Sequence, residues 1–566
     1  MFESAVGFLN RERCTDFKPV SESLYEGFVV VGNERFKLSI DLGKGFPNDF
    51  PIIQVLESKK FHPHATFEGP LCLLNKEEVI VKEGMENELL LDSYDRAIEI
   101  LDMDPQEQKK EILREFSVYW EIRSVLGVRL YLNLPDAKEH EYQEYIAIGP
   151  SPDRLVVSGS IEESKVLLAN NMQCPLEKTE TIRMICTRIR LREPAVPPRM
   201  NGQFTWRSIR AYIQDNITGG QKRQFEKLLS IKTRKVNRMV IIVIPSDEGD
   251  QHACFWVHSN ESKKPMSIKN TLWSTVDAVA TSRIDLNYML ARGGAETGLR
   301  DKSVLLIGAG SVGGFLAENL CQCGVGALDI LDKDKLSVDN VHRHVLGFND
   351  AMTGEYKADL LKMRLESRFP YVEIDSLNFT DRSVESFLKD PERLLGYDLV
   401  ISATGNPTVD LVINDVLHEF DDRPPFIVCF NEPYGIGGHA IAILNTGACL
   451  RCLYSDPISG ETVPFLGSFV RSDQSFSKTM SGCAGSFVDY SVLDSQQTAI
   501  LATRLSIDVL RGECGNSRII SWLGPSDKLM QAGFKTSEFF EELWNTHLTS
   551  IIKDVPRNER CRICGS

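Results

Sequence analysis

Three glycines and a downstream acid are the first residues whose types and spacing could do chemistry. Gly308, Gly310 and Gly313 follow the apolar segment 303–307, and the next apolar segment ends on Asp332. Glycines at a strand-to-helix turn let the backbone approach a phosphate, and the N–H groups at the helix start can bind an anion. An acid about twenty residues further on can bind a ribose hydroxyl. The pattern therefore predicts a nucleotide site, and by itself it favours a dinucleotide cofactor.

Two cations and an amide follow the glycine turn within one helix and loop. They are Asn340, Arg343 and Lys357. A dinucleotide cofactor does not require them, whereas they suit a triphosphate that must be gripped and cleaved between its α- and β-phosphates. The larger pattern therefore favours ATP. An oxidoreductase with a dinucleotide cofactor stays open as an alternative, although it leaves Arg343 and Lys357 unexplained.

Four of the cysteines form two CxxC pairs, Cys449/Cys452 and Cys561/Cys564. Each pair can place two thiolates on one metal ion, and two pairs complete the tetrahedral site of a structural zinc ion. We expect this zinc to attach the end of the chain to its domain and to take no part in catalysis.

Two other cysteines lie in segments that predict loops. Cys72 follows a segment of little periodicity that contains His62 and Pro63, and Cys483 lies in a segment rich in serine and glycine before an amphipathic helical pattern. A loop thiol near a helix N-terminus can have a lowered pKa and accept an acyl group. The alternatives are a buried core thiol for Cys72 and an ordinary loop cysteine for Cys483.

These residues are positioned by three predicted domains. In residues 1–125, strand patterns precede helical spacing, which predicts an α+β domain. Residues 126–285 have a mixed α/β pattern without a catalytic constellation, and we interpret them as a linker domain. In residues 286–566, strands and helices alternate, which predicts an α/β fold with a doubly wound parallel sheet and the nucleotide at the C-terminal ends of its strands.

Length and composition agree with a multidomain protein of the cytoplasm. The chain has 566 residues, more than one hydrophobic core normally serves. Its net charge of −15 is spread along the chain, which argues against direct nucleic-acid binding and against an anionic membrane surface. No apolar run approaches the ~20 residues of a membrane helix, and the start resembles no signal sequence. We therefore expect the 14 cysteines to stay reduced.

Residues 286–566 resemble the adenylating domain of ubiquitin-activating enzymes and their bacterial relatives MoeB and ThiF. The resemblance implies that a protein's C-terminal carboxylate attacks the α-phosphate of ATP, that Cys483 takes the acyl group, and that Arg292 acts in the partner subunit of a homodimer. The family's Thr-Asp-Asn is Thr-Gly-Asn here, so the aspartate that binds magnesium is replaced by Gly405. The residues that the resemblance assigns to ATP are Gly308, Gly310, Gly313, Asp332, Asn340, Arg343, Lys357 and Asn406.

Residues 1–125 resemble the ubiquitin-conjugating enzymes. The evidence is the meander of strands, a proline turn, the His62-Pro63 pair ten positions before Cys72, and the two leucines after that cysteine. The resemblance implies that Cys72 carries an acyl group and transfers it to an amine. The family has a His-Pro-Asn tripeptide, whose asparagine stabilises the oxyanion. The position of that asparagine is His64 here, so His64 or Asn75 is the candidate donor.

The two domains together resemble the fused activating and conjugating enzymes of bacterial CBASS anti-phage operons. This resemblance implies a homodimer that adenylates the C-terminal glycine of a cGAS-like CD-NTase, forms thioesters on Cys483 and then Cys72, and ligates the protein to an amine on a target. The alternatives are activation of a sulfur-carrier protein without ligation, and an inactive scaffold, for which Gly405 and His64 argue.

Overall fold

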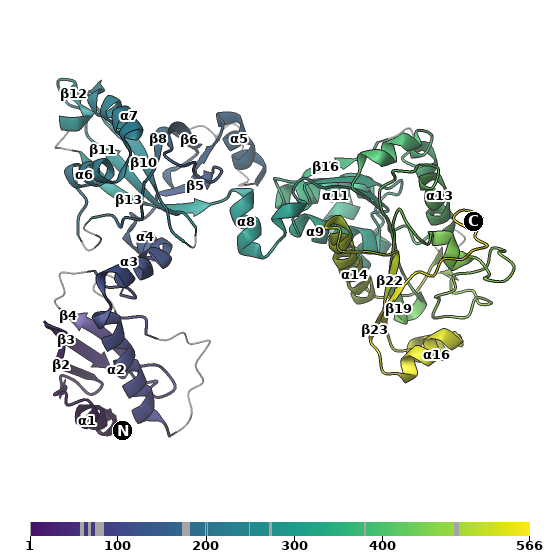
Figure 1. Ribbon diagram of the computed structural model, residues 1–566, viewed down its shortest axis with the longest axis horizontal. Coiled ribbons are helices and arrows are strands. Elements are labelled where there is room, and N and C mark those ends of the chain that lie inside the picture. Colours follow the sequence, from purple (N-terminus) through teal and green to yellow (C-terminus); the bar gives the residue numbers. More distant parts are fainter. Residues whose placement is uncertain are drawn as a thin grey trace. The chain divides into compact units, whose positions relative to one another are not determined.

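The computed structural model describes residues 2–565 except 57–60, 66–69, 74–83, 172–181, 199, 201, 248, 271–273, 379–380 and 480–485. The chain forms two compact units, Met1–Asp285 and Leu286–Ser566 (Figure 1). Within the described ranges, no helix has both the length and the apolar character that a membrane span needs.

The N-terminal unit begins with an antiparallel sheet against which helices pack. The strands pair in the order β1-β2-β3-β4. Along β2, buried residues alternate with more exposed ones, because one face of the sheet covers the core and the other faces solvent. The elements are α1 (Phe2–Glu12), β1 (Lys18–Pro19), β2 (Leu24–Val31), β3 (Glu34–Asp41), β4 (Ile52–Leu56) and α2 (Glu86–Asp102).

Two short helices, α3 (Pro105–Arg114) and α4 (Phe116–Arg123), follow this sheet. Asp104 caps α3 by accepting two backbone N–H groups, and a proline occupies the first helical position. Although the first predicted domain includes both helices, the apolar side chains of Phe116 and Trp120 lie in one core with residues of the following barrel. The apolar side chains of these helices therefore pack with the barrel, whereas the core of the sheet is formed with α1 and α2.

The middle of the chain is a closed barrel with strand order β10-β11-β13-β5-β7-β6-β8. The sequence indicated a mixed α/β region but not this closure. β10 is buried on both faces: Met239 and Ile241 join a cluster made by residues of all the barrel strands, while Val240 and Ile242 pack toward helices α6 (Trp206–Asn216) and α7 (Gly219–Ser230). The strands are β5 (Arg129–Asn133), β6 (Tyr142–Gly149), β7 (Leu155–Ser158), β8 (Ile182–Arg190), β10 (Asn237–Ile244), β11 (Gln251–His258) and β13 (Thr275–Arg283).

The C-terminal unit is built on a sheet with strand order β16-β15-β14-β17-β18-β19-β22-β23. From β16 to β18 neighbouring strands are parallel, which confirms the predicted doubly wound parallel sheet. The last three strands pair antiparallel, and the short turn between β18 and β19 leaves no room for a crossover helix at that pair. The strands are β14 (Ser303–Ile307), β15 (Ala327–Leu331), β16 (Glu373–Ser376), β17 (Leu399–Ser402), β18 (Phe426–Asn431), β19 (Gly437–Ile443), β22 (Arg518–Leu523) and β23 (Ser550–Asp554).

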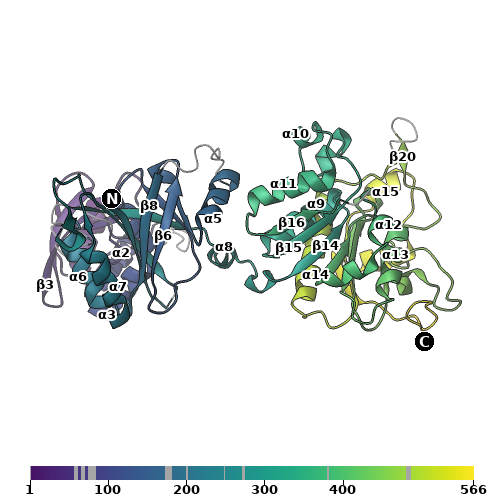
Figure 2. The same ribbon diagram turned by 90° about the horizontal axis from the view of Figure 1, so that it is seen from above.

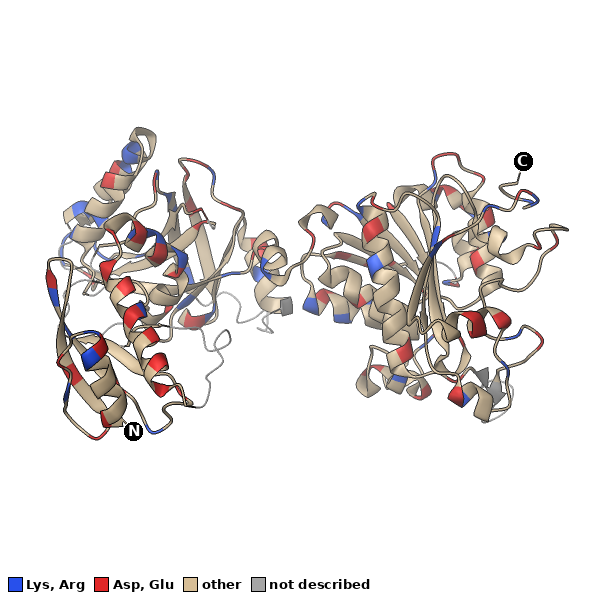
Figure 3. Cartoon of the chain, turned by 60° about the horizontal axis from the view of Figure 1, so that its bottom comes forward, with Lys and Arg blue, Asp and Glu red and all other residues tan. Residues whose placement is uncertain are grey.

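Helices cover both faces of this sheet (Figure 2). Val304 and Leu306 of β14 pack with α9 (Ser311–Gln322), α11 (Lys357–Arg368) and α14 (Val492–Leu510). Leu305 and Ile307 point to the other face and pack with α13 (Pro407–Leu417). A central strand buried on both sides is typical of parallel sheets. In both units, acidic and basic residues are interspersed (Figure 3).

Candidate nucleotide and cysteine sites

The glycine turn lies between β14 and α9. Gly308 has a φ of +97°, which favours glycine. A Cβ on Gly313 would lie 1.9 Å from the carbonyl oxygen of Gly308, so the helix can approach the strand this closely only with glycine there. Gly310, in contrast, borders open space and lines two pockets. The turn is therefore closed toward the protein and accessible from the pockets, as phosphate binding requires.

The carboxylate of Asp332 lies at the end of β15, beside the glycine turn. It accepts the backbone N–H groups of Ala309 and Asp334, each at 2.7 Å. Burial raises the pKa of Asp332, while the Lys357 ammonium and these two N–H donors act in the opposite direction. The hydrogen bonds fix the orientation of the carboxylate at the pocket wall, where a ribose hydroxyl could reach it.

The predicted phosphate ligands come together in front of the turn. Nη2 of Arg343 donates to Oδ1 of Asn340 at 3.1 Å, and both residues lie in the 3-10 helix Val338–Arg343. Lys357 begins α11, and its Nζ lies 3.1 Å from a carboxylate oxygen of Asp334. The side chains of Asp334, Asn340, Arg343 and Lys357 line the same pocket. The two cations, Arg343 and Lys357, therefore face the space beyond the glycine turn.

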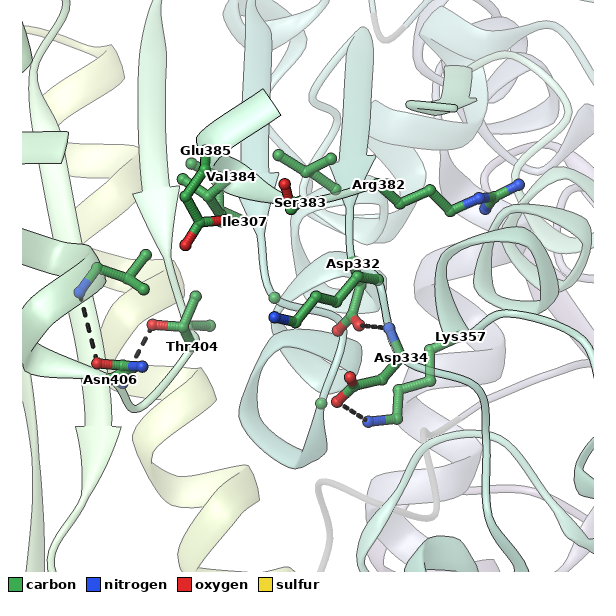
Figure 4. A pocket seen from close by; sticks show the side chains of 16 residues that line it. Ile307, Asp332, Asp334, Lys357, Arg382, Ser383, Val384, Glu385, Thr404 and Asn406 are labelled. Atoms are coloured by element: carbon green, nitrogen blue, oxygen red, sulfur yellow. Dashed lines mark hydrogen bonds and ion pairs between the residues drawn. The ribbon is translucent and has the colours of Figure 1, made fainter. Parts of the chain in front are cut away.

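Two cavities meet at this point. The first, of about 320 Å³, contains Asp332, and the second, of about 550 Å³, contains Arg343. In the first cavity, Asp332 and Lys357 lie on one side and Thr404 and Asn406 on another (Figure 4). The residues that both cavities share are Gly310, Asp334, Lys357, Ala403 and Thr404. The two adjoining cavities together are large enough for a nucleotide whose phosphates reach Arg343.

Tyr490 and Arg382 line these cavities but were not identified from the sequence. The Tyr490 hydroxyl lies 3.0 Å from Oγ of Ser311, and the Arg343 guanidinium lies 5.3 Å from the centre of the Tyr490 ring. Arg382 contacts Asp359 at 2.9 Å. Arg382 follows β16, so the rule that ligands bind beyond the carboxyl ends of parallel strands could have found it. The Tyr490 contact spans 179 positions, and no local pattern indicates it.

Asp410 is a buried acid beneath the loop that carries Thr404. It accepts hydrogen bonds from the hydroxyl groups of Ser402 and Thr404. Burial raises its pKa to about 7. Because an unfolded aspartate ionises near pH ~4, the folded state retains a proton that the unfolded state has lost. The stabilising contribution is therefore complete below pH ~4 and is lost as the pH rises through about 7.

We expect Asp410→Asn to flatten this pH dependence. Between pH ~5 and ~7.5, the wild type should lose about 2 kcal/mol of unfolding free energy relative to the variant. Urea unfolding of the C-terminal unit at the two pH values measures the difference. The exposed Asp422 provides the control Asp422→Asn, which should keep the wild-type dependence. Equal pH dependence of wild type and Asp410→Asn would contradict the raised pKa.

The loop after β17 lacks a carboxylate for magnesium, because Gly405 occupies that position with a φ of +63°. The side-chain oxygen of Asn406 is already used, since it caps α13 by accepting the N–H groups of Thr408 and Val409. Oxygen donors do exist in both cavities, namely the Asp334 carboxylate and the Thr404 hydroxyl. These two residues suit a magnesium ion that is held mainly by phosphates and water.

Two predicted site residues stay without a structural test of their role. Arg292 lies exposed on α8 (Leu286–Gly293) and lines neither of them. Its action in a partner subunit stays a prediction. Cys483 lies outside the described residues, and its role stays a prediction as well.

The two CxxC pairs come together although 112 positions separate them. Sγ of Cys449 lies 3.5 Å from Sγ of Cys561, and Sγ of Cys452 lies 3.3 Å from Sγ of Cys564. All four sulfur atoms lie within 4.8 Å of one another. Four mutually close thiols are the donor set of a structural zinc ion.

Cys72 is exposed and lines a cavity of about 380 Å³ in the N-terminal unit. The loop 41–52 forms much of the wall of this cavity. The N–H of Cys72 donates to the carbonyl oxygen of His64 at 2.6 Å, so the two predicted site residues are neighbours. The exposed thiol does not fit a buried core cysteine. The function of His64 as oxyanion donor stays a prediction, as does that of Asn75, which lies outside the described residues.

Comparison with known proteins found a family match and relatives that share part of this chain. Residues 285–497 match the ThiF family. ATP-dependent ubiquitin transferase-like protein Cap2 of Escherichia coli (strain TW11681) is 26% identical over 296 residues, which are 50% of this chain and 44% of that protein. Sulfur carrier protein adenylyltransferase of Thermus thermophilus is 28% identical over 178 residues, which are 29% of this chain and 60% of that protein. Each alignment thus covers less than two thirds of the relative.

A solved structure is also similar to part of the chain. It is the Microcin C7 biosynthetic enzyme MccB in complex with N-formylated MccA, with 15% sequence identity and a TM-score of 0.34. The likeness covers 50% of this chain and 76% of that one.

Proposed function

We propose that this chain, which carries a ThiF-like domain, uses ATP to adenylate the C-terminal carboxylate of a protein substrate. The observation that carries this proposal is that the two cavities of the C-terminal unit adjoin at the glycine turn and share Lys357 in their walls. With its ribose at Asp332, a nucleotide would extend its phosphates past the glycine turn toward Arg343 and Lys357. The second cavity leaves space for a carboxylate beside the α-phosphate.

In the proposed step, a carboxylate oxygen of the substrate attacks the α-phosphorus of ATP. The bond from that phosphorus to the bridging oxygen breaks, and pyrophosphate leaves with the bonding electrons. Arg343 and Lys357 stabilise the charge that develops on the phosphate oxygens. A magnesium ion held near Asp334 and Thr404 would neutralise further phosphate charge.

The acyl group then moves to the chain's own cysteines. Cys483 attacks the acyl-adenylate, AMP leaves, and thiol exchange transfers the acyl group to Cys72, which passes it to an amine of a target protein. The exposure of Cys72 supports this relay, as does the likeness to Cap2 over half of the chain. By this likeness we propose a cGAS-like CD-NTase ending in glycine as substrate, a homodimer as the working form, and CBASS anti-phage signalling as the setting.

Activation of a sulfur-carrier protein without ligation is the second candidate function. The likeness to the Thermus thermophilus adenylyltransferase favours it. This function needs the two cavities of the C-terminal unit but not Cys72, so adducts on Cys72 distinguish the two functions.

We expect Arg343→Ala to lower ATP–pyrophosphate exchange by roughly 100-fold or more, because it removes a preorganised donor to the reacting phosphates. The assay contains the full chain, ATP, magnesium and a candidate protein that ends in glycine. The matched control is Arg364→Ala, since Arg364 lies on α11, pairs with Glu318 and lines neither cavity. If the Arg343→Ala variant exchanged pyrophosphate with ATP at the wild-type rate, the adenylation proposal would lose its basis.

A further inference from the structure

His64 connects the cysteine loop to the helices that lead into the barrel. Its backbone has a φ of +57°, which is uncommon for histidine. Its N–H donates to the hydroxyl oxygen of Tyr119 at 2.6 Å, and its carbonyl oxygen accepts the N–H of Cys72 at 2.6 Å. The backbone of this one residue therefore links the proposed acyl carrier directly to α4.

The ring of His64 is held between two carboxylates. Nε2 lies 3.1 Å from Oε1 of Glu111, and Nδ1 lies 3.1 Å from Oε1 of Glu115. The hydroxyl of Tyr119 donates to the second carboxylate oxygen of Glu115. The His64 side chain is only 11% exposed. Both ring nitrogens are thus engaged, one by α3 and the other by Glu115 at the junction of α3 and α4, and neither is left to face the thiol.

The helices that hold His64 are fixed in turn by the barrel. The Trp120 indole N–H donates to the carbonyl oxygen of Val279 at 3.0 Å, and its ring packs edge-on against Phe255 at 5.1 Å. On the loop side, Phe61 packs against the Tyr119 ring at 5.1 Å. The same short helical segment therefore contacts the cysteine loop with one set of side chains and the barrel core with another.

We propose that His64 is a positioning residue that holds the Cys72 loop on α3 and α4 through Glu111, Glu115 and Tyr119. The inference rests on the proposed function of Cys72 and gives the middle domain a role in it. The barrel supports the helices, and the helices keep the thiol in place for acyl transfer. A loop held in its working geometry needs no reorganisation at the moment of reaction.

Hydrogen exchange tests this proposal without relying on catalysis. In the full chain with Glu111→Gln and Glu115→Gln together, the amide of Cys72 should exchange about tenfold faster, because two charge-assisted contacts to the loop are lost. The control is His258→Asn, which breaks a histidine–carboxylate pair of 2.7 Å in the barrel. Unchanged exchange at Cys72 in the double variant would overturn the proposal.

A second variant separates positioning from oxyanion stabilisation. His64→Asn restores the amide that ubiquitin-conjugating enzymes use, and asparagine tolerates positive φ, but its shorter side chain does not span the two carboxylates. Positioning by His64 predicts that this variant exchanges faster at Cys72 and discharges a preloaded Cys72 thioester to lysine about tenfold more slowly. If the Cys72 amide of this variant exchanged at the wild-type rate and its thioester discharged as fast as the wild type or faster, positioning by His64 would be overturned. If the wild type forms no Cys72 thioester, the proposed function fails, while the exchange result still decides the positioning.

Discussion

Cys483→Ala is expected to abolish every ATP-dependent adduct on the chain, whereas Cys72→Ala is expected to trap the adduct on Cys483. The reason is the order of transfer. Adenylation activates the carboxylate, the first thiol takes the acyl group with release of AMP, and the second thiol takes it only by exchange. Removal of the first thiol therefore interrupts both thioesters, and removal of the second interrupts only the last one.

The measurement uses the full chain with ATP, magnesium and a candidate protein that ends in glycine. Adducts are located by peptide mass spectrometry, and their sensitivity to an added thiol identifies them as thioesters. Cys14→Ala is the matched control, because Cys14 is also an exposed cysteine of the N-terminal unit. Loss of both adducts in Cys72→Ala would mean that the order of transfer is wrong. Pyrophosphate exchange without any adduct would favour activation of a sulfur carrier.

The parts of the fold that could be predicted from sequence are those set by local patterns. The parallel strands of the C-terminal unit follow from alternating strands and helices, and the ThiF match at residues 285–497 agrees with the interpretation of the glycine turn. Closure of the barrel could not be predicted, because the sequence pattern of a strand does not show which other strands it pairs with. β5, for example, pairs with β7 and β13, and β13 lies far along the chain.

Contacts over long sequence distances explain what the motifs missed. The sequence predicted Arg343 but not Tyr490, over whose ring its guanidinium lies, because only the folded chain brings Tyr490 to the glycine turn. His64 was recognised by its place in a tripeptide, yet its ring contacts carboxylates that lie 47 and 51 positions away. A motif names the residue type that chemistry needs, whereas the partners that hold that residue depend on tertiary packing.

The four clustered cysteines connect two segments of the C-terminal unit that lie far apart in the sequence. Cys449 precedes the short helix Leu450–Tyr454 and Cys452 lies within it, and both are buried in a core with β14 and α13. The segment that carries Cys561 and Cys564 is held there by a few contacts, among them the N–H of Asn558 to Sγ of Cys452 at 3.4 Å. A zinc ion bound by all four thiolates would join this segment to the sheet, so its loss should destabilise the C-terminal unit.

We expect the wild-type chain to contain about one zinc ion and Cys561→Ser to lose most of it. Structural zinc contributes roughly 10 kcal/mol of apparent binding free energy in small domains, so removing one ligand should cost several kcal/mol of unfolding free energy and lower the melting temperature. Elemental analysis measures zinc content, and calorimetry with and without a chelator measures stability. Cys514→Ser, a buried cysteine outside the cluster, is the control and should retain the metal. A wild-type chain without zinc, or a variant that melts like the control, would contradict the structural zinc site.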